Sequence, residues 1–185
     1  TLIGAANMDV EALTMYKEPG YMAVDNCDDT LTMQVVVSGT VDSSVLGRVK
    51  ITYEVKDANG NAAKVIRTVN VVDTQKPTLK LLGGDTVYVE VFTPYSEPGV
   101  VVNDTFDQAP TYQSSGNVDE RVLGTYPITY WGVDQSGNVS DLVKRYVVVR
   151  DTTLPTIQLS RSSDTIVVDV FEKYLQELPL YWDNY

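Results

Sequence analysis

Apolar and polar residues alternate with a period of two along most of the chain. Residues 86–92 show this alternation clearly, and residues 146–149 form a run rich in β-branched side chains. Both patterns are typical of β-strands. Because short strands of this kind alternate with turn residues, the sequence predicts an all-β chain built of sandwiches.

The pattern is repeated along the chain. The linker at residues 73–79 recurs at 151–157, and the Glu-Pro-Gly turn at 18–20 recurs at 97–99. Repeats of this length predict small domains in tandem, and we expect about seven short antiparallel strands in each complete one. The predicted boundaries are 1–73 for the first repeat, 74–151 for the second repeat, and 152–185 for the beginning of a third.

Each complete repeat contains a clear hairpin. In the first repeat, residues 51–56 alternate between apolar and polar side chains before the turn at 57–61, and residues 134–138 form the corresponding turn of the second repeat. Asn-Gly and Ser-Gly pairs supply the positive backbone angles that a tight turn needs. We therefore expect two long paired strands in each repeat.

Three segments together resemble a known family. They are the Asp-rich segment at 24–29, the stretch from 41 to 53 with its Leu-Gly turn, and the Asp-x-x-Gly-Asn turn followed by a Val-rich strand. These resemble bacterial immunoglobulin-like domains of the hyalin-repeat type, over both repeats and the fragment. The resemblance implies tandem immunoglobulin-like antiparallel β-sandwiches joined end to end. It also implies a role in a surface adhesin, a stalk, or a spacer of a secreted enzyme or toxin.

Composition narrows the possible chemistry. The net charge is −11, from 25 acidic and 14 basic residues, and a surface of this sign repels nucleic acid. Histidine is absent, which removes the commonest general base and zinc ligand. Cys27 has no partner for a disulfide or a zinc cluster, and we expect it to be a small buried side chain. No apolar run approaches the roughly 20 residues of a membrane span.

Loop oxygens near the linker are candidate calcium ligands. In a sandwich that the chain enters at one end, the Glu-Pro-Gly turn and the hairpin both lie beside the preceding linker. We therefore expect a weak calcium site, since a divalent ion would relieve the repulsion between crowded carboxylates. The alternative is that the hairpin acids cap their own turns and that the others are hydrated loop side chains. The predicted ligands are Asp73, Glu97, Asp134 and Asn138.

Trp131 is the candidate for an aromatic contact surface. By alternation it lies on the face that Glu54 occupies in the first repeat, which should be turned to solvent. An exposed Trp131 beside Tyr126 would stack on a sugar or contact a protein partner. The alternative is cross-strand packing, for example against Tyr146.

The sequence thus predicts a protein segment that is not an enzyme. Adjacent acids such as Asp119 and Glu120 point to opposite faces of a strand, whereas glycoside hydrolysis needs two carboxylates across a cleft. We expect an extracellular or cell-surface stalk or adhesive array of a bacterial surface or secreted protein. Its partners would be neighbouring repeats of the same chain and a surface glycan or protein. The alternative function is a carbohydrate-binding or spacer module attached to a secreted hydrolase or toxin.

Overall fold

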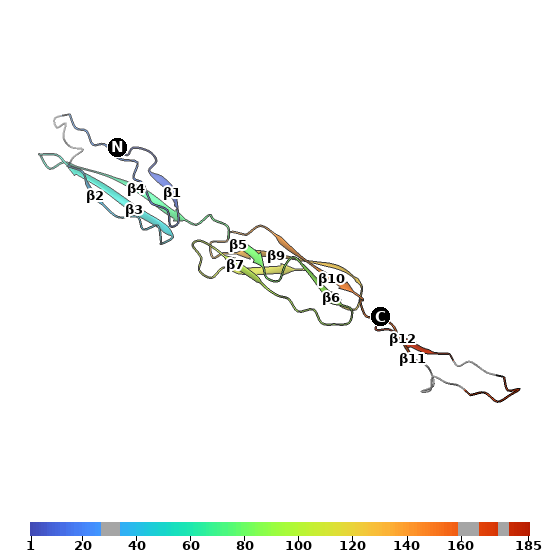
Figure 1. The fold of residues 1–185 in the computed structure, drawn as a ribbon. Helices are drawn as coiled ribbons and strands as arrows, with labels where there is room; N and C mark the ends of the chain where they lie inside the picture. The colour runs from blue at the N-terminus through green and yellow to red at the C-terminus, as the bar shows by residue number, and fades with distance from the viewer. Residues whose placement is uncertain (27–33, 159–166, 174–177) are drawn as a thin grey trace. The chain divides into compact units, whose positions relative to one another are not determined.

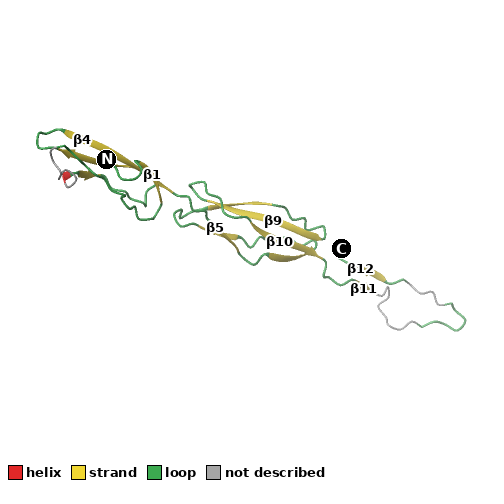
Figure 2. Ribbon diagram, turned by 90° about the horizontal axis from the view of Figure 1, so that it is seen from above, coloured by secondary structure: helices red, strands yellow, loops and turns green. Residues whose placement is uncertain are grey.

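The computed structural model describes residues 1–26, 34–158, 167–173 and 178–185. The named elements within these residues are all β-strands (Figure 1), and strands and loops make up nearly all of the ribbon in Figure 2, which confirms the predicted fold class. No helix in this part of the chain has the length and apolar character needed to cross a membrane.

The described chain divides into two compact units. The first consists of Thr1–Pro77, Asn103–Thr111 and Val133–Val139, and the second of Thr78–Val102, Tyr112–Gly132 and Ser140–Tyr185.

The first repeat contains a four-stranded sheet in the order β1-β4-β3-β2 (Figure 1). The long strands β3 and β4 form the predicted antiparallel hairpin, and β1 pairs with β4 in parallel. An isolated antiparallel bridge joins Leu2 to Tyr21 opposite this sheet's core face. The strands are β1 (Asn7–Glu11), β2 (Val36–Ser38), β3 (Gly47–Lys56) and β4 (Ala62–Val72).

The second repeat has the same sheet in the order β6-β10-β9-β8, together with a two-stranded sheet of β5 and β7. Strands β9 and β10 are antiparallel, whereas β6 and β10 are parallel. The strands are β5 (Thr78–Leu81), β6 (Thr86–Glu90), β7 (Val100–Asn103), β8 (Thr111–Ser115), β9 (Gly124–Val133) and β10 (Val143–Arg150).

Alternating side chains of the two sheets form the core of the second repeat. Ile128, Tyr130 and Val147 are buried on the four-stranded sheet, and Leu81 and Val100 of the small sheet pack against them. Residues next to each other on these strands point to opposite faces, so every second side chain reaches the core. The predicted sandwich is therefore confirmed.

The strand directions differ from the prediction in one respect. The sandwiches are not wholly antiparallel, because the first long strand of each repeat runs beside the last one in the same direction. Six strands have defined bounds in the second repeat, not seven. The parallel pairing follows from tandem connection: a chain that enters a sandwich at one end and leaves at the other must begin and finish in the same direction.

Within the described residues of the third repeat there is one strand pair. β11 (Thr156–Gln158) and β12 (Leu180–Trp182) are antiparallel, with Ile157 opposite Tyr181. These strands correspond in sequence order to β5 and β7, but their side chains are exposed.

Candidate functional site

Glu97, a predicted calcium ligand, instead binds a buried arginine. The Arg145 side chain is 0% exposed, and its Nη2 lies 3.3 Å from Glu97 Oε1. The same nitrogen donates hydrogen bonds to the carbonyl oxygens of Leu82 at 2.7 Å and Gly99 at 3.0 Å. The Glu-Pro-Gly turn therefore supplies both a carboxylate and a carbonyl oxygen to the guanidinium.

Two tyrosine hydroxyls also bind the Glu97 carboxylate. Tyr130 donates to Glu97 Oε2 at 2.6 Å, Tyr95 donates to the same oxygen, and the Gly99 amide donates to Oε1 at 2.9 Å. Burial acts to raise the pKa of the Glu97 carboxyl group, but the hydrogen bonds from Tyr130, Tyr95 and the Gly99 amide, together with the positive charge of Arg145, outweigh it, so the pKa is lowered. Burial and the hydrogen bond to Glu97 raise the pKa of Tyr95 to about 12.

The first repeat contains the same network. Arg67 is fully buried, its Nη2 lies 3.1 Å from Glu18 Oε1, and it donates to the carbonyl oxygens of Ile3 and Gly20. Tyr53 donates to Glu18 Oε2 at 2.6 Å. Both arginines were missed from the sequence, although each lies within the Val-rich last strand of its repeat, on the face that alternation turns to the core. The Glu-Pro-Gly turns are thus structural elements that hold a buried charge.

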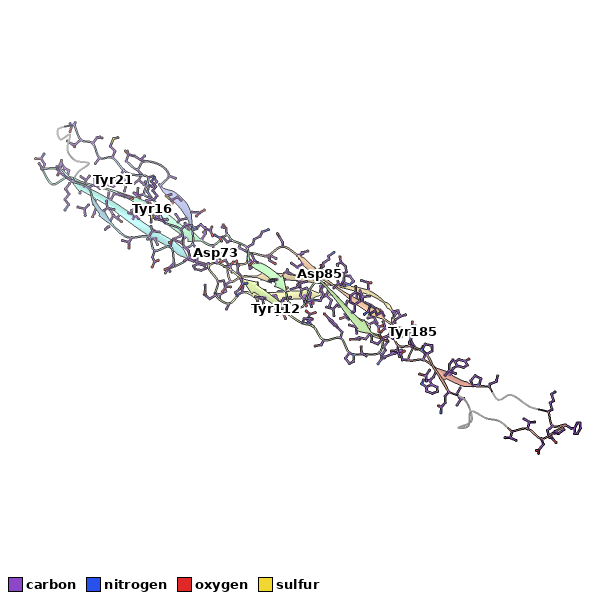
Figure 3. The ribbon with its side chains drawn as sticks, viewed as in Figure 1. Tyr16, Tyr21, Asp73, Asp85, Tyr112 and Tyr185 are labelled. Carbon is purple, nitrogen blue, oxygen red and sulfur yellow. The ribbon has the colours of Figure 1, made fainter. Side chains whose placement is uncertain are left out.

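Three aspartates meet elsewhere, within the first compact unit. One carboxylate oxygen from each of Asp73, Asp104 and Asp134 lies within 4.8 Å of the others. Each is the first residue after a strand: Asp73 follows β4 (Figure 3), Asp104 follows β7, and Asp134 follows β9. Asp73 is 8% exposed and Asp134 is 6% exposed. Of the four predicted ligands, the structure therefore brings together Asp73, Asp134 and Asn138, adds Asp104, and places Glu97 in the arginine network.

Hydrogen bonds fix two of these carboxylates in place. Asp134 Oδ1 accepts from the Asn138 amide at 2.7 Å, and Oδ2 accepts from Asn138 Nδ2 at 2.8 Å. Asn138 Nδ2 also donates to the Asp73 carbonyl oxygen at 3.2 Å, and the Ser136 hydroxyl donates to Asp73 Oδ2 at 2.8 Å. Asn138 therefore presents its amide nitrogen to the cluster and acts as a donor that positions the acids.

Asp104 differs from its neighbours because one of its oxygens has no partner. Its Oδ1 accepts from the amides of Phe106 at 2.8 Å and Asp107 at 2.9 Å, whereas its Oδ2 is buried without a hydrogen bond. Asp107 is also buried, and its Oδ2 accepts from the Gln135 amide at 2.9 Å. Asp107 is therefore held inside, because this part of the loop turns inward to bind the hairpin.

The hairpin aspartates do cap their own turns. In the first repeat, Asp57 Oδ1 accepts from the amides of Asn59 at 2.9 Å and Asn61 at 2.8 Å. Asp134 forms the corresponding bond with Asn138 in the second repeat. These bonds are the turn caps that the sequence offered as the alternative to calcium ligands. The carboxylate oxygens keep further lone pairs beside these bonds.

Trp131 and Tyr126 lie on opposite faces of β9. Tyr126 packs against the core, and its hydroxyl donates to the Val122 carbonyl oxygen at 2.8 Å. Trp131 is partly buried on the other face, at the position where the first repeat has the exposed Glu54. The structure therefore does not bring the two aromatic rings onto one surface. Cys27 lies outside the described residues.

Each complete repeat also holds the start of the linker that follows it. Glu11, at the end of β1, accepts hydrogen bonds from the Thr74 amide at 2.9 Å and its hydroxyl at 2.6 Å. Glu90, at the end of β6, binds the Thr152 amide and hydroxyl in the same way. Hydrogen bonds from Thr152 lower the pKa of Glu90 to about 2. The start of each linker is therefore bound to the repeat that precedes it.

The chain is similar to several known proteins. The family described as "Bacterial surface protein, Ig-like domain" matches residues 1–71 and 79–149. An uncharacterized 81.3 kDa protein of Acholeplasma phage L2 is 27% identical over 76% of the chain. The serine-rich adhesin for platelets of Staphylococcus aureus is 26% identical over 64% of the chain, and hyalin of Lytechinus variegatus is 30% identical over 60%. The chain spans between 6% and 22% of the length of these relatives.

Proposed function

The chain belongs to the family of Ig-like domains of bacterial surface proteins, and we propose that it is a non-catalytic part of a stalk or adhesive array. Membership confirms the resemblance to bacterial immunoglobulin-like domains. It also supports a location at the cell surface or outside the cell. In such an array, each repeat adds reach, and exposed surfaces contact a glycan or protein partner.

The linker attachment is the observation that carries this proposal. Glu11 and Glu90 occupy equivalent positions at the ends of β1 and β6, and both bind the threonine that follows the linker aspartate. A linker bound through its backbone amide and its side chain loses much of the freedom of a flexible connection. A spacer built to let its domains move independently would not need the same device at two successive linkers.

The names of the relatives support an adhesive role within the array. The Staphylococcus aureus relative is named as an adhesin, and the chain corresponds to 6% of its length. Segments of this size in a long repeat protein act either as spacers or as contact modules. We propose that this chain does the first through its linkers and the second through its exposed side chains.

Small-angle scattering on the 185-residue chain tests the stalk role. We expect an extended particle, and we expect Glu11→Gln to shorten its largest dimension because the Thr74 contacts weaken. Glu54→Gln is the matched control, since Glu54 is exposed on β3 and its ion-pair partner, at 3.9 Å, is Lys64 of the neighbouring strand and not a linker residue. A compact particle for the unmodified chain would contradict the stalk role.

A further inference from the structure

We propose that Asp73, Asp104 and Asp134 together bind one calcium ion. The three carboxylates come from a linker, a loop and a hairpin turn that the sequence separates by about thirty residues at each step. The ion would join these segments within the first compact unit. The proposal is independent of the surface role, because it rests on the geometry of the three side chains alone.

The three aspartates bring negative charges close together in a largely buried place. Asp73 and Asp134 are both more than nine-tenths buried, and their oxygens lie within 4.8 Å of an oxygen of Asp104. Like charges at this distance repel, and the repulsion is weakly screened where water is excluded. Among the described residues, no hydrogen-bond donor reaches Asp104 Oδ2, although this atom is fully buried. A buried polar atom without a partner is costly, and a cation bound there would remove both costs.

The atoms that meet here are oxygens of the kind that calcium binds. Calcium is a hard cation that takes six to eight oxygen ligands, and carboxylates are its preferred side chains. The three aspartates supply carboxylate oxygens, and the Ser136 hydroxyl lies 2.8 Å from Asp73 Oδ2, beside the cluster. Water would complete the coordination shell. Asn138 holds the Asp134 carboxylate through two hydrogen bonds, so this ligand is already oriented for an ion.

The second linker offers a comparison within the same chain. Asp151 corresponds to Asp73, and Asp183 directly follows β12 as Asp104 directly follows β7. In the amide orientation that satisfies its hydrogen bonds, Asn184 donates to Asp151 Oδ1 at 3.3 Å and to Asp183 Oδ1 at 2.6 Å. A donor therefore stands between the two acids of the second linker. The first linker brings together three acids, one of them with a bare buried oxygen, and a cation is the partner that fits there.

Calcium titration of the metal-free 185-residue chain tests the proposal. Isothermal titration calorimetry should show one ion per chain, with a dissociation constant of about 10⁻⁴–10⁻³ M, as in other extracellular modules. Saturating calcium should raise the melting temperature by a few degrees more than sodium chloride of the same ionic strength. Magnesium should bind more weakly, because it requires a tighter octahedral shell.

Asp104→Asn is the variant of choice. The asparagine oxygen can still accept the hydrogen bonds of the Phe106 and Asp107 amides, so the loop should keep its fold. Its new amide group replaces the unpartnered oxygen and can donate to a neighbouring carboxylate. We expect the metal-free melting temperature to be unchanged or higher, and the calcium affinity to fall by at least about tenfold. Asp57→Asn is the matched control in the first hairpin and should leave the calcium response intact.

Three results would overturn the proposal. The first is an identical melting temperature in calcium chloride and in sodium chloride of matched ionic strength, since hydrated acids respond only to screening. The second is an Asp104→Asn variant that is folded by circular dichroism and binds calcium as the unmodified chain does. The third is magnesium binding as tight as calcium binding, which would exclude calcium as the preferred ion.

Discussion

Replacement of Glu97 by alanine is the most direct test of the buried arginine network. Arg145 is fully buried, and without the carboxylate its Nη2 keeps only the carbonyl oxygens of Leu82 and Gly99. Tyr130 loses its acceptor at the same time. The variant therefore leaves a positive charge without its counter-ion and a hydroxyl without its partner.

The expected cost follows from burial. Removing one partner of a buried ion pair costs about 3–5 kcal/mol. Because the Glu97 side chain is 32% exposed, water can enter the gap, and we expect the lower end, about 3 kcal/mol. In a domain of about 60–100 residues, each kcal/mol lowers the melting temperature by roughly 4–8 °C, so the second repeat should melt about 12–24 °C lower.

Tryptophan fluorescence can report on the second repeat separately. Trp131 lies on β9, directly after Tyr130, so its emission follows the unfolding of this sheet once Trp182 is replaced by phenylalanine. The Glu97→Ala transition should move to lower temperature. Glu18→Ala is the matched control, because it damages the equivalent network of the first repeat and should leave the Trp131 transition in place.

A double-mutant cycle shows whether the stranded charge causes the loss. In an Arg145→Met background no guanidinium remains to be stranded, so Glu97→Ala should cost less than about 1 kcal/mol. The reasoning would be refuted by an equal cost in both backgrounds. A Trp131 transition that Glu97→Ala does not shift would refute it as well.

Two further predictions concern pH and backbone geometry. Folding raises the pKa of Tyr130 and so favours its neutral form. Its contribution to the free energy of unfolding is therefore complete below pH 10.0, the ordinary pKa, and should be lost as the pH rises further. Melting curves at alkaline pH measure this loss. The pKa of Glu97 is lowered by folding, so its contribution to stability is present above pH 4.5 and should be lost in acid. A melting temperature that stays constant at both acid and alkaline pH would contradict these two expectations. Gly137 has φ 89° and open space around it, so Gly137→Ala should lower the free energy of unfolding by roughly 1–2 kcal/mol. Gly116 has φ 129°, and an added Cβ would also lie 2.4 Å from the Pro127 carbonyl oxygen, so Gly116→Ala should cost more. Equal losses in urea unfolding of the two variants would show that the close contact is relieved by movement.

Periodicity was sufficient to predict the strands because burial follows it closely. Ile51 and Tyr53 face the core of the first repeat, and Glu54 faces solvent, as alternation requires. The hairpin turns were predictable from their Gly, Asn and Asp residues, whose positive angles and side-chain hydrogen bonds recur in both repeats. Local patterns thus determine most of this fold.

The functional clusters could not be predicted in the same way, because they depend on contacts between distant residues. A charged side chain in a strand is usually solvent-exposed, yet alternation places Arg145 on the same face as Val147 and Val149, both of which are buried. Glu97 was assigned to the linker cluster because its turn was expected at the end where the chain enters the sandwich, but the structure pairs its carboxylate with the buried guanidinium of Arg145. Asp104 was missed because about thirty residues separate it from Asp73 and from Asp134 in the sequence, and only the fold brings the three together.

The parallel pairing of β6 with β10 determines how the second repeat responds to tension. The pair runs from Thr86 opposite Tyr146 to Glu90 opposite Arg150. Force applied through the two ends of the repeat pulls these strands in opposite directions along their length. Their hydrogen bonds are then loaded in shear and must break together, whereas an antiparallel pair pulled from one end opens one bond at a time. The strand order of this domain therefore gives it a mechanical clamp between its first and last long strands.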